Sequence, residues 1–261
     1  MKKQRLNIVI PSRTQGKQVF FLERAVASVR HQTVIDKFDL NFLVGVDAGK
    51  IPRGGDIGSR LEITFIESHG NSQAAALNAA IRNVNADFVA FLEDDDQWYP
   101  RYLEFAMQAI SSADFVSSTQ IEYDEKGELL RINDFPTPSG WFMPASTLKQ
   151  VGEFNESFRF HLDNEWLGRL AETKLKRFHM VESTAPIKKE FISSVRPWLG
   201  YALDLSGGYC QIMRHHSPYP LVKRLVHSGS GMAQIAENKS FQEISRREQE
   251  ILVNRFGRIP W

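Results

Sequence analysis

Four consecutive acidic residues, Glu93-Asp94-Asp95-Asp96, directly follow the apolar run 88–92. Neighbouring carboxylates repel one another unless a cation or hydrogen-bond donors offset their charge. Hard divalent cations such as Mg²⁺ and Mn²⁺ prefer a few carboxylates together with phosphate oxygens and water. The run is therefore a candidate site for a divalent ion that bridges the protein to a diphosphate. Acidic residues before a helix also serve as caps, an interpretation that fits Asp96 best.

Two further polar clusters, Pro11-Ser12-Arg13 and Asp47-Ala48, each come directly after a short apolar run. Open α/β sheets bind ligands outside the carboxyl ends of their strands. If the apolar runs are parallel strands, all three clusters meet at one edge of the sheet. The sequence therefore predicts a crevice at that edge with acidic groups on its floor.

The spacing of apolar residues predicts the elements that carry these clusters. In the first 112 residues, short apolar runs alternate with helical stripes, which is typical of parallel strands joined by helices. Segment 124–127 separates two later runs and predicts an antiparallel hairpin. The expected fold is α/β, with a mixed, mostly parallel sheet flanked by helices and a C-terminal helical extension. We expect strands at 6–10, 42–46, 61–66 and 88–92, helices at 22–29, 74–84, 100–110, 163–170 and 241–253, and a loop at 51–59.

Composition excludes several classes of protein. The 261 residues carry a formal net charge of only +1, which gives no reason to expect a nucleic-acid partner. The single cysteine, Cys210, excludes an internal disulfide framework and fits a cytoplasmic location. No apolar run has the length of a transmembrane helix, whereas peripheral membrane contact and oligomerisation stay open.

Four segments, in order, resemble those of family 2 glycosyltransferases of the GT-A fold. Residues 6–13 resemble the family's opening strand, which ends in Pro-Thr/Ser, and 91–100 resemble its Leu-Asp-x-Asp-Asp-x-x-x-Pro segment. Residues 151–156 resemble Val-Gly-Gly-Phe-Asp-Glu, and 163–166 resemble the start of its Glu-Asp-x-Glu/Asp-Trp/Leu helix. The resemblance implies a GT-A domain over 1–185, with a nucleotide-sugar half (1–112) and an acceptor half (113–185), followed by an extension (186–261).

The resemblance also implies an activity and a donor site. We expect a metal-dependent, inverting transfer of a sugar from a nucleotide-diphosphate donor, most commonly a UDP-sugar among relatives, to an acceptor hydroxyl in glycan or polysaccharide synthesis. Mn²⁺ or Mg²⁺ would be bound at Asp95, with Glu93 and Asp94 near the ribose and the ion. The nucleoside pocket would be lined by Pro11, Ser12, Arg13 and Asp47.

The acceptor site is expected around Asp163, which the resemblance makes the general base. An inverting transfer needs a carboxylate within hydrogen-bond reach of the acceptor hydroxyl. Trp166 and Trp141 could stack on a sugar, and His161 is close enough in sequence to line the site. The alternative is that Asp163 caps a helix and Trp166 is core. Glu165 is the second candidate for the base.

A histidine is the other candidate metal ligand. The segment Arg214-His215-His216 resembles the family's Arg-x-His stretch, and we favour His216 there. The simpler interpretation is a surface or core histidine. The remaining histidines, including His69, His179 and His227, have no comparable sequence context.

Departures from the family pattern keep other functions open. Glu93 replaces the usual first Asp, Leu162 stands in place of Glu, Ala48 replaces an acid, and Leu77 occupies a position where many relatives have Arg. A binding protein without turnover would explain them. A nucleotidyltransferase is a further alternative, although such enzymes usually have a Gly-rich loop after the first strand. A dinucleotide-dependent dehydrogenase is disfavoured because no G-x-G-x-x-G follows a strand.

Overall fold

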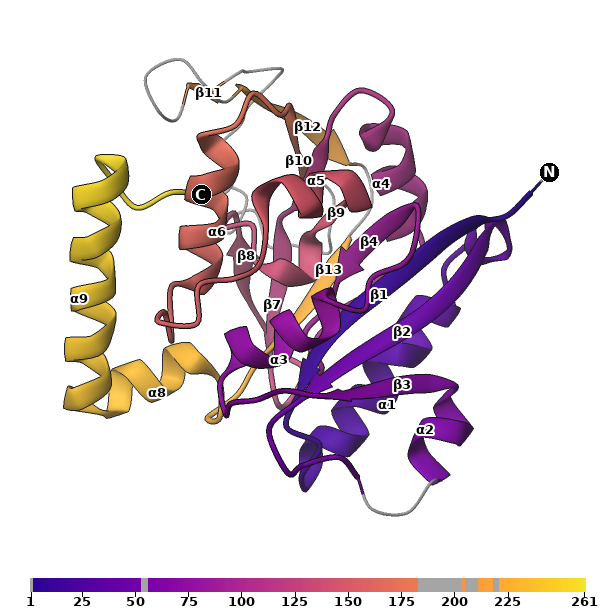
Figure 1. The fold of residues 1–261 in the computed structure, drawn as a ribbon, viewed down its shortest axis with the longest axis horizontal. Coiled ribbons are helices and arrows are strands. Elements are labelled where there is room, and N and C mark those ends of the chain that lie inside the picture. Colours follow the sequence, from indigo (N-terminus) through magenta and orange to yellow (C-terminus); the bar gives the residue numbers. More distant parts are fainter. Residues whose placement is uncertain (1, 53–55, 183–202, 205–210, 218–220) are drawn as a thin grey trace.

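The computed structural model describes residues 2–52, 56–182, 203–204, 211–217 and 221–261 (Figure 1). Within these residues, one sheet has nine strands in the order β11-β12-β10-β6-β9-β4-β1-β2-β3, and a second has the order β5-β13-β7-β8. The large sheet contains β1 (Gln4–Ser12), β2 (Phe38–Val46), β3 (Ile63–Glu67), β4 (Phe88–Phe91), β6 (Phe115–Ser118), β9 (Phe142–Pro144), β10 (Arg177–Glu182), β11 (Leu203–Asp204) and β12 (Gln211–Ser217). The small sheet contains β5 (Gln97–Trp98), β7 (Gln120–Asp124), β8 (Leu129–Asn133) and β13 (Val222–Val226).

The strand directions confirm the predicted fold class. Strands β1, β2, β3 and β4 pair in parallel, as do β6, β10 and β12, while β9 runs antiparallel between β4 and β6. The predicted hairpin is also confirmed, because β7 pairs with β8 in antiparallel register. The helices are α1 (Lys17–Arg30), α2 (Asp56–Leu61), α3 (Gln73–Ile81), α4 (Tyr102–Ile110), α5 (Ala145–Val151), α6 (Leu162–Ala171), α8 (Gly231–Glu237) and α9 (Lys239–Phe256).

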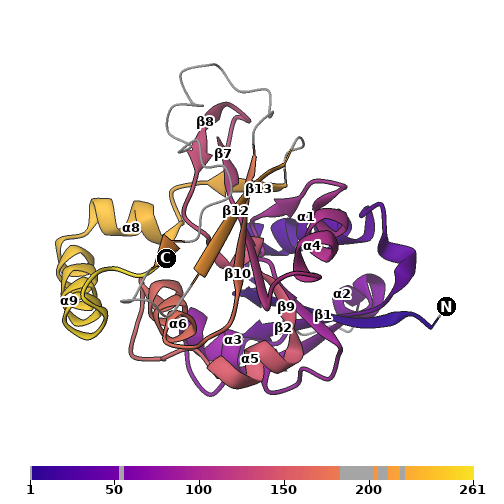
Figure 2. The ribbon, with the colours of Figure 1, turned by 90° about the horizontal axis from the view of Figure 1, so that it is seen from above.

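Helices cover both faces of the large sheet (Figure 2). Alternate side chains of β1 point to opposite faces, as strand geometry requires. Leu6, Ile8 and Ile10 pack with residues of α1 and α4, whereas Val9 packs with residues of α3, α5 and α6. Burial on both faces explains why the strands read as nearly continuous apolar runs.

Helix α3 packs on β2 so tightly that one contact tolerates only glycine. A Cβ atom at Gly45 in β2 would lie 1.9 Å from the carbonyl oxygen of Ala76 in α3. The alanine-rich start of α3 and Gly45 together let the helix backbone approach the sheet. Helix α3 therefore lies directly against β1 and β2.

The C-terminal region differs from the sequence prediction. The predicted helix near 241–253 is confirmed as α9, but the extension also contributes β11 and β12 to the large sheet and β13 to the small one. Strand β13 pairs with both β5 and β7, which places it next to the acidic run. In addition, α2 lies partly in the segment expected to be a loop. Among the described residues, no helix is both long and apolar enough to span a lipid bilayer.

Candidate active site

The ends of β1, β2 and β4 meet at one edge of the sheet, as the sequence predicts. Ser12 at the end of β1 lies opposite Val46 at the end of β2. The Ser12 hydroxyl donates a 2.6 Å hydrogen bond to the carboxylate of Asp94, just beyond β4. Pro11 and Arg13 flank Ser12 in the chain. The polar clusters after β1 and β4 are therefore in direct contact.

Each of the other acidic residues has a different set of partners. The carboxylate of Glu93 accepts a 2.6 Å hydrogen bond from Gln73 in α3. Asp96 is 1% exposed and accepts hydrogen bonds from the Ser139 hydroxyl (2.5 Å) and from the backbone N–H of Leu225 in β13 (3.1 Å). Asp96 does not cap α4, whose N-cap residue is Arg101. Asp96 instead connects residues 93–96, called the acidic loop below, to the 138–140 turn and to β13.

Burial changes the protonation of this loop. Burial, reinforced by the charge of Asp95, raises the pKa of Glu93 to about 7 and that of Asp94 to about 8. The same two causes raise the pKa of Asp96 well above its usual range. The loop is therefore partly protonated at neutral pH, and a cation placed here would displace protons.

His227, which follows β13, completes the cluster. Its Nε2 atom lies 2.9 Å from a carboxylate oxygen of Asp95, and both side chains are mostly buried. The hydrogen bond to Asp95 raises the pKa of the His227 imidazole. Our sequence analysis assigned this histidine no role and favoured His216, whose side chain lies outside the described part of the chain. The available signal was only its position after Leu225-Val226, because Lys223 and Arg224 interrupt the apolar pattern of β13.

This arrangement fits a divalent cation. One oxygen each from Glu93, Asp95 and Asp96 lie within 4.8 Å of one another. Both oxygens of Asp96 already accept hydrogen bonds, whereas Asp95 faces the His227 imidazole. Carboxylate oxygen and imidazole nitrogen are both suitable donors for Mn²⁺. The strongest candidate ligands are therefore Asp95 and His227.

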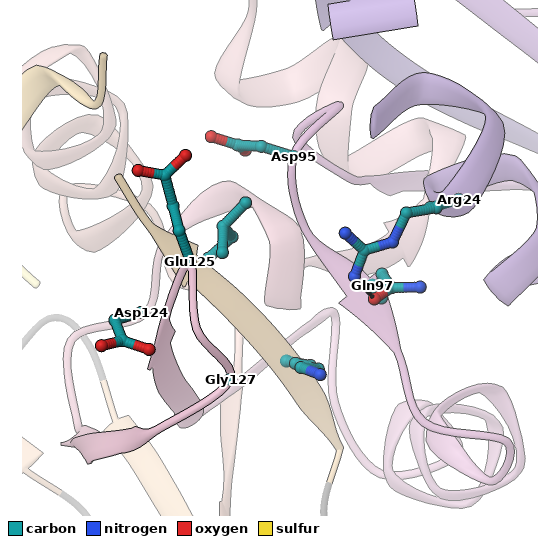
Figure 3. A pocket seen from close by; sticks show the side chains of 8 residues that line it. Arg24, Asp95, Gln97, Asp124, Glu125 and Gly127 are labelled. Atoms are coloured by element: carbon teal, nitrogen blue, oxygen red, sulfur yellow. Dashed lines mark hydrogen bonds between the residues drawn. The ribbon is translucent and has the colours of Figure 1, made fainter. Parts of the chain in front are cut away.

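A cavity of about 90 Å³ adjoins this cluster (Figure 3). Arg24 of α1 donates a 2.6 Å hydrogen bond to Gln97 on one side. Glu125, in the turn between β7 and β8, lies on the other, and Asp95 lies at one end. The lining carries charges of both signs, so the cavity suits a hydrated ion or a phosphate better than an apolar group. It is lined by Arg24, Asp95, Gln97, Asp124, Glu125, Gly127, Lys223 and Leu225.

The predicted nucleoside residue Asp47 follows β2 at the same edge and is half-buried. The loop after it is fixed by the neighbouring strand: the N–H of Ala48 donates to the Gly70 carbonyl (3.1 Å), and that of Gly49 donates to the Glu67 carboxylate (2.5 Å). Arg13 is exposed nearby in the chain, after Ser12. The edge thus has a carboxylate, Asp47, and a guanidinium, Arg13, in addition to the Ser12–Asp94 pair.

Asp163, the predicted general base, lies in the first turn of α6. Its carboxylate accepts the backbone N–H of Asn164 at 2.8 Å. Burial raises its pKa, and the charges of His161 and Arg224 oppose this shift. The charge of Asp163 in turn contributes to the raised pKa of Glu93. The base candidate and the acidic loop are therefore close enough for their charges to interact.

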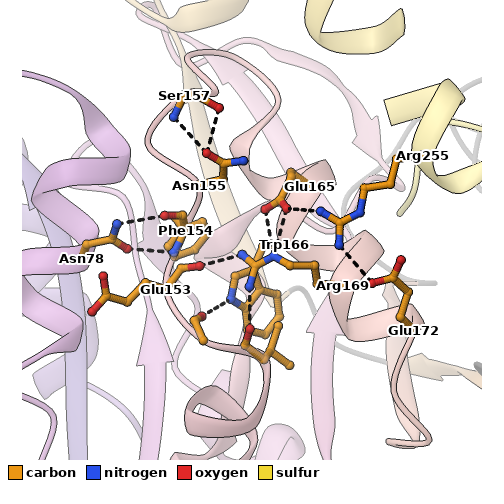
Figure 4. Close-up of polar contacts among 12 residues, drawn as sticks. Asn78, Glu153, Phe154, Asn155, Ser157, Glu165, Trp166, Arg169, Glu172 and Arg255 are labelled. Carbon is orange, nitrogen blue, oxygen red and sulfur yellow. Dashed lines mark hydrogen bonds and ion pairs between the residues drawn. The ribbon is translucent and has the colours of Figure 1, made fainter. Parts of the chain in front are cut away.

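Glu165 is not available as an alternative base. Its carboxylate is 3% exposed and accepts hydrogen bonds from Arg169 (2.9 Å) and Arg255 (3.3 Å) (Figure 4). Glu165 follows Asp163 by two residues, so the two side chains lie on different faces of α6. The face that carries Glu165 is the one that α9 covers. Glu165 thus belongs to a structural ion-pair network.

The expectation that Trp141 and Trp166 present a face to a sugar is wrong. Both are 0% exposed, and their rings pack against each other with centroids 4.8 Å apart. Their indole N–H groups donate to the carbonyls of Pro136 and Gly152, respectively. Packing explains this, because the two rings fill the space between β9 and α6. The interpretation of Trp166 as core is confirmed.

His161 also faces inward rather than toward an open site. Its Nδ1 lies 3.1 Å from the Asn164 side-chain oxygen, and its Nε2 lies 2.8 Å from the hydroxyl of Ser245 in α9. Both ring nitrogens are therefore already engaged. His161 connects the start of α6 to α9, and any contact with an acceptor would have to use the edge of its ring.

Comparison with known families shows which family the chain belongs to. The family model for glycosyl transferase family 2 matches residues 8–169, which is more than half of the chain. The chain therefore belongs to glycosyl transferase family 2, and its mixed sheet flanked by helices is the GT-A fold. The matched region includes the ends of β1, β2 and β4 and the start of α6, but not His227.

Known proteins support this assignment. The chain is 35% identical over 117 residues to the succinoglycan biosynthesis protein ExoW of Rhizobium meliloti (strain 1021), a match that covers 42% of this chain and 35% of ExoW. The match thus spans about a third of that relative. S. aureus TarS 1-349 in complex with UDP-GlcNAc has a similar fold (TM-score 0.59, 11% identity, 96% of this chain and 67% of that chain). So does the mannosyltransferase PcManGT of Pyrobaculum calidifontis in complex with GDP-Man and Mn²⁺ (TM-score 0.52, 14% identity, 74% and 60%).

Proposed function

We propose that the protein is a metal-dependent, inverting glycosyltransferase that moves a sugar from a UDP-sugar to an acceptor hydroxyl during glycan or polysaccharide synthesis. The observation that carries the proposal is the Asp95–His227 pair beside Glu93, whose pKa is raised by burial and by the charges of both Asp95 and Asp163. The name of ExoW, the UDP-GlcNAc bound to TarS, and the Mn²⁺ bound to PcManGT support the reaction, the donor and the metal, respectively.

The donor would lie across the strand ends. Asp95, with His227 beside it, would hold a Mn²⁺ or Mg²⁺ ion, which offsets the negative charge that builds on the departing diphosphate. Ser12 orients Asp94, and Gln73 orients Glu93, so both carboxyls are fixed before a ligand arrives. Pro11, Arg13 and Asp47 would line the nucleoside side, and a cytoplasmic location, where nucleotide sugars are made, is part of the proposal.

Asp163 would remove the acceptor proton. Because burial raises its pKa, Asp163 is a stronger base than an exposed aspartate. The acceptor oxygen would attack the anomeric carbon from the side opposite the diphosphate, so the anomeric configuration would invert. Product with retained configuration would contradict this part of the proposal.

Thermal unfolding with UDP, GDP, dTDP and CDP, each with and without Mn²⁺, tests the donor site. A ligand at a hundredfold excess over its dissociation constant stabilises the folded state by about 2.7 kcal/mol. We expect UDP to stabilise the protein only with Mn²⁺, and Asp95→Ala and His227→Ala to abolish that effect. Glu153→Gln, an exposed ion-pair partner of Arg82, is the matched control.

A second measurement separates catalysis from binding alone. With Mn²⁺ present, slow UDP release from UDP-glucose, UDP-galactose or UDP-GlcNAc would show that the bound donor is turned over. Metal-dependent UDP binding without release from any of these donors would favour the binding protein without turnover.

A further inference from the structure

A buried carboxylate in the C-terminal helix binds the segment that leads into the proposed base. Glu248 of α9 is 4% exposed. Its oxygens accept the backbone N–H groups of three consecutive residues, Arg159 (2.6 Å), Phe160 (2.9 Å) and His161 (3.0 Å). Helix α6 begins at the next residue, and Asp163 is its second residue. The contact joins positions that are 87 to 89 residues apart in the sequence.

These three donors are the polar partners of the Glu248 carboxyl group. Within the described residues, no lysine or arginine forms an ion pair with this carboxylate. A buried carboxylate is costly unless hydrogen bonds satisfy it, and bonds from backbone N–H groups to an ionised oxygen are stronger than neutral ones. The three hydrogen bonds are directional, so they fix the backbone conformation of residues 159–161.

A second pair of contacts fixes the other side of Asp163. The ring of His161 bridges Ser245 of α9 and Asn164 of α6. The Asn164 side chain also donates a 2.7 Å hydrogen bond to the carbonyl of Pro260, close to the C-terminus. The residues on both sides of Asp163 are thus held by the C-terminal segment, while the carboxylate of Asp163 accepts only a local backbone N–H among the contacts seen.

The rest of α9 lies firmly along α6. Arg255 forms ion pairs with Glu165 (3.3 Å) and Glu172 (3.1 Å). Near the same end, Gly168 lies so close to the Phe256 ring that an added Cβ would be 2.6 Å from it. Contacts in the middle of α9, at Ser245 and Glu248, and at its last turn hold this helix against α6 and the segment that leads into it.

We propose that Glu248 is a positioning residue for the transfer reaction: by binding the 159–161 backbone it sets the direction in which Asp163 meets the acceptor hydroxyl. This inference rests on the proposed function of Asp163 as base. A displacement of about 1 Å at a reacting group can lower a rate on the order of a hundredfold. Glu248 itself contacts neither donor nor acceptor and leaves donor binding unaffected.

Glu248→Gln tests the proposal, because glutamine keeps the shape but loses the charge and one acceptor oxygen. Glu250→Gln, on the exposed side of the same helix, is the matched control. With Mn²⁺ and UDP-glucose, UDP-galactose or UDP-GlcNAc, we expect kcat for UDP release to fall about tenfold to a hundredfold in Glu248→Gln, with the donor KM unchanged. Glu248→Asp should recover part of the loss, and Ser245→Ala should give a smaller loss if the glutamine variant does not fold.

A double variant and hydrogen exchange distinguish positioning from general stability. Adding Glu248→Gln to Asp163→Asn should cause no further loss of kcat, because the base is already absent, and exchange at the 159–161 amides should rise about tenfold in Glu248→Gln. A full additional loss in the double variant, or wild-type kcat in Glu248→Gln, would overturn the positioning role. Full activity of Asp163→Asn would instead overturn the proposed base, which keeps the two failures separate.

Discussion

The two carboxylate-bearing regions of the site are built in different ways. The acidic loop after β4 is held by partners at the ends of neighbouring elements, such as Ser12 after β1 and Gln73 in α3. The C-terminal segment holds the residues on both sides of Asp163: Glu248 binds 159–161 before α6, and the Pro260 carbonyl binds Asn164 in its first turn. Strand topology thus positions the proposed donor side (the acidic loop and the strand ends), whereas a remote helix positions the proposed acceptor side (the start of α6).

Because the two regions are held by different parts of the chain, we expect ligand binding and the transfer step to respond to different substitutions. Changes to the acidic loop should remove the ligand, because the loop is the proposed site of the metal and the diphosphate. Changes near α6 should leave the ligand bound and affect the transfer step. The following predictions test that separation, from the largest expected effect to the smallest.

Asp163→Asn should lower the rate of UDP release about 10²-fold to 10⁴-fold, because the acceptor proton loses its base. Stabilisation of the variant by UDP and Mn²⁺ should match that of the wild type, since Asp163 is not among the proposed metal or nucleotide ligands. Kinetics and thermal unfolding on the same preparation would check both. Loss of UDP binding would show that the two sides are not independent.

Gly45→Ala should lower the free energy of unfolding by about 3 kcal/mol, because its Cβ would collide with the backbone carbonyl of Ala76 and α3 would have to move. Urea unfolding would measure the change. Gly58→Ala in α2 is the control, since its Cβ would meet only ordinary contacts at 3.5 Å or more. A loss below about 1 kcal/mol at Gly45 would show that the donor half is more pliable than its packing indicates.

Mn²⁺ binding should tighten as the pH rises from 6 to 8. Glu93 and Asp94, with pKa values of about 7 and about 8, hold protons at the lower pH that the ion must displace. Each displaced proton contributes up to about a tenfold change in affinity per pH unit. Without metal the sign is opposite: stability should fall as the pH rises toward 8, because the unfolded chain has already released these protons.

Titration calorimetry with Mn²⁺ at pH 6, 7 and 8 would measure this dependence. Asp94→Asn should flatten it, because one raised carboxyl is removed. An affinity that is independent of pH in the wild-type protein would contradict the expected protonation of the loop.

Gly168→Ala should have the smallest effect, a loss of about 1 kcal/mol in the free energy of unfolding. Its Cβ would meet the Phe256 ring at 2.6 Å, but a side chain at the end of α9 can turn away, and alanine favours the helix. We expect a modest drop in UDP release with normal UDP binding. A loss as large as that of Gly45→Ala would show that both regions are equally rigid.

The proposed donor side could be predicted from the sequence because the patterns that mark it lie within a few consecutive residues. An apolar run followed by polar residues marks a strand end, and parallel strands bring such ends together. The prediction of contact between the clusters after β1 and β4 was confirmed by the Ser12–Asp94 hydrogen bond. His227 was missed because β13, which carries it to Asp95, lies in a region of weak pattern and pairs with β5 and β7 from distant parts of the chain.

The acceptor side was predicted less well. The helix that begins near Asp163 was expected, but side-chain direction was not accessible. The sequence made Trp141 and Trp166 candidates for stacking on a sugar, with core as the alternative for Trp166, and only the packing of β9 against α6 shows that both are core. Glu165 similarly needed Arg255, 90 residues away, to show its structural role.

By itself, the sequence determined the family, the α/β layering, and the order of the strand ends that carry Ser12 and the acidic run. These follow from periodicity and from short motifs, which act within a few residues. Only the tertiary structure decided which histidine meets Asp95, which aromatic rings are buried, and that Glu248 holds the turn before Asp163. Those outcomes depend on contacts between elements far apart in the chain, where close packing and the need to satisfy buried polar groups select one arrangement.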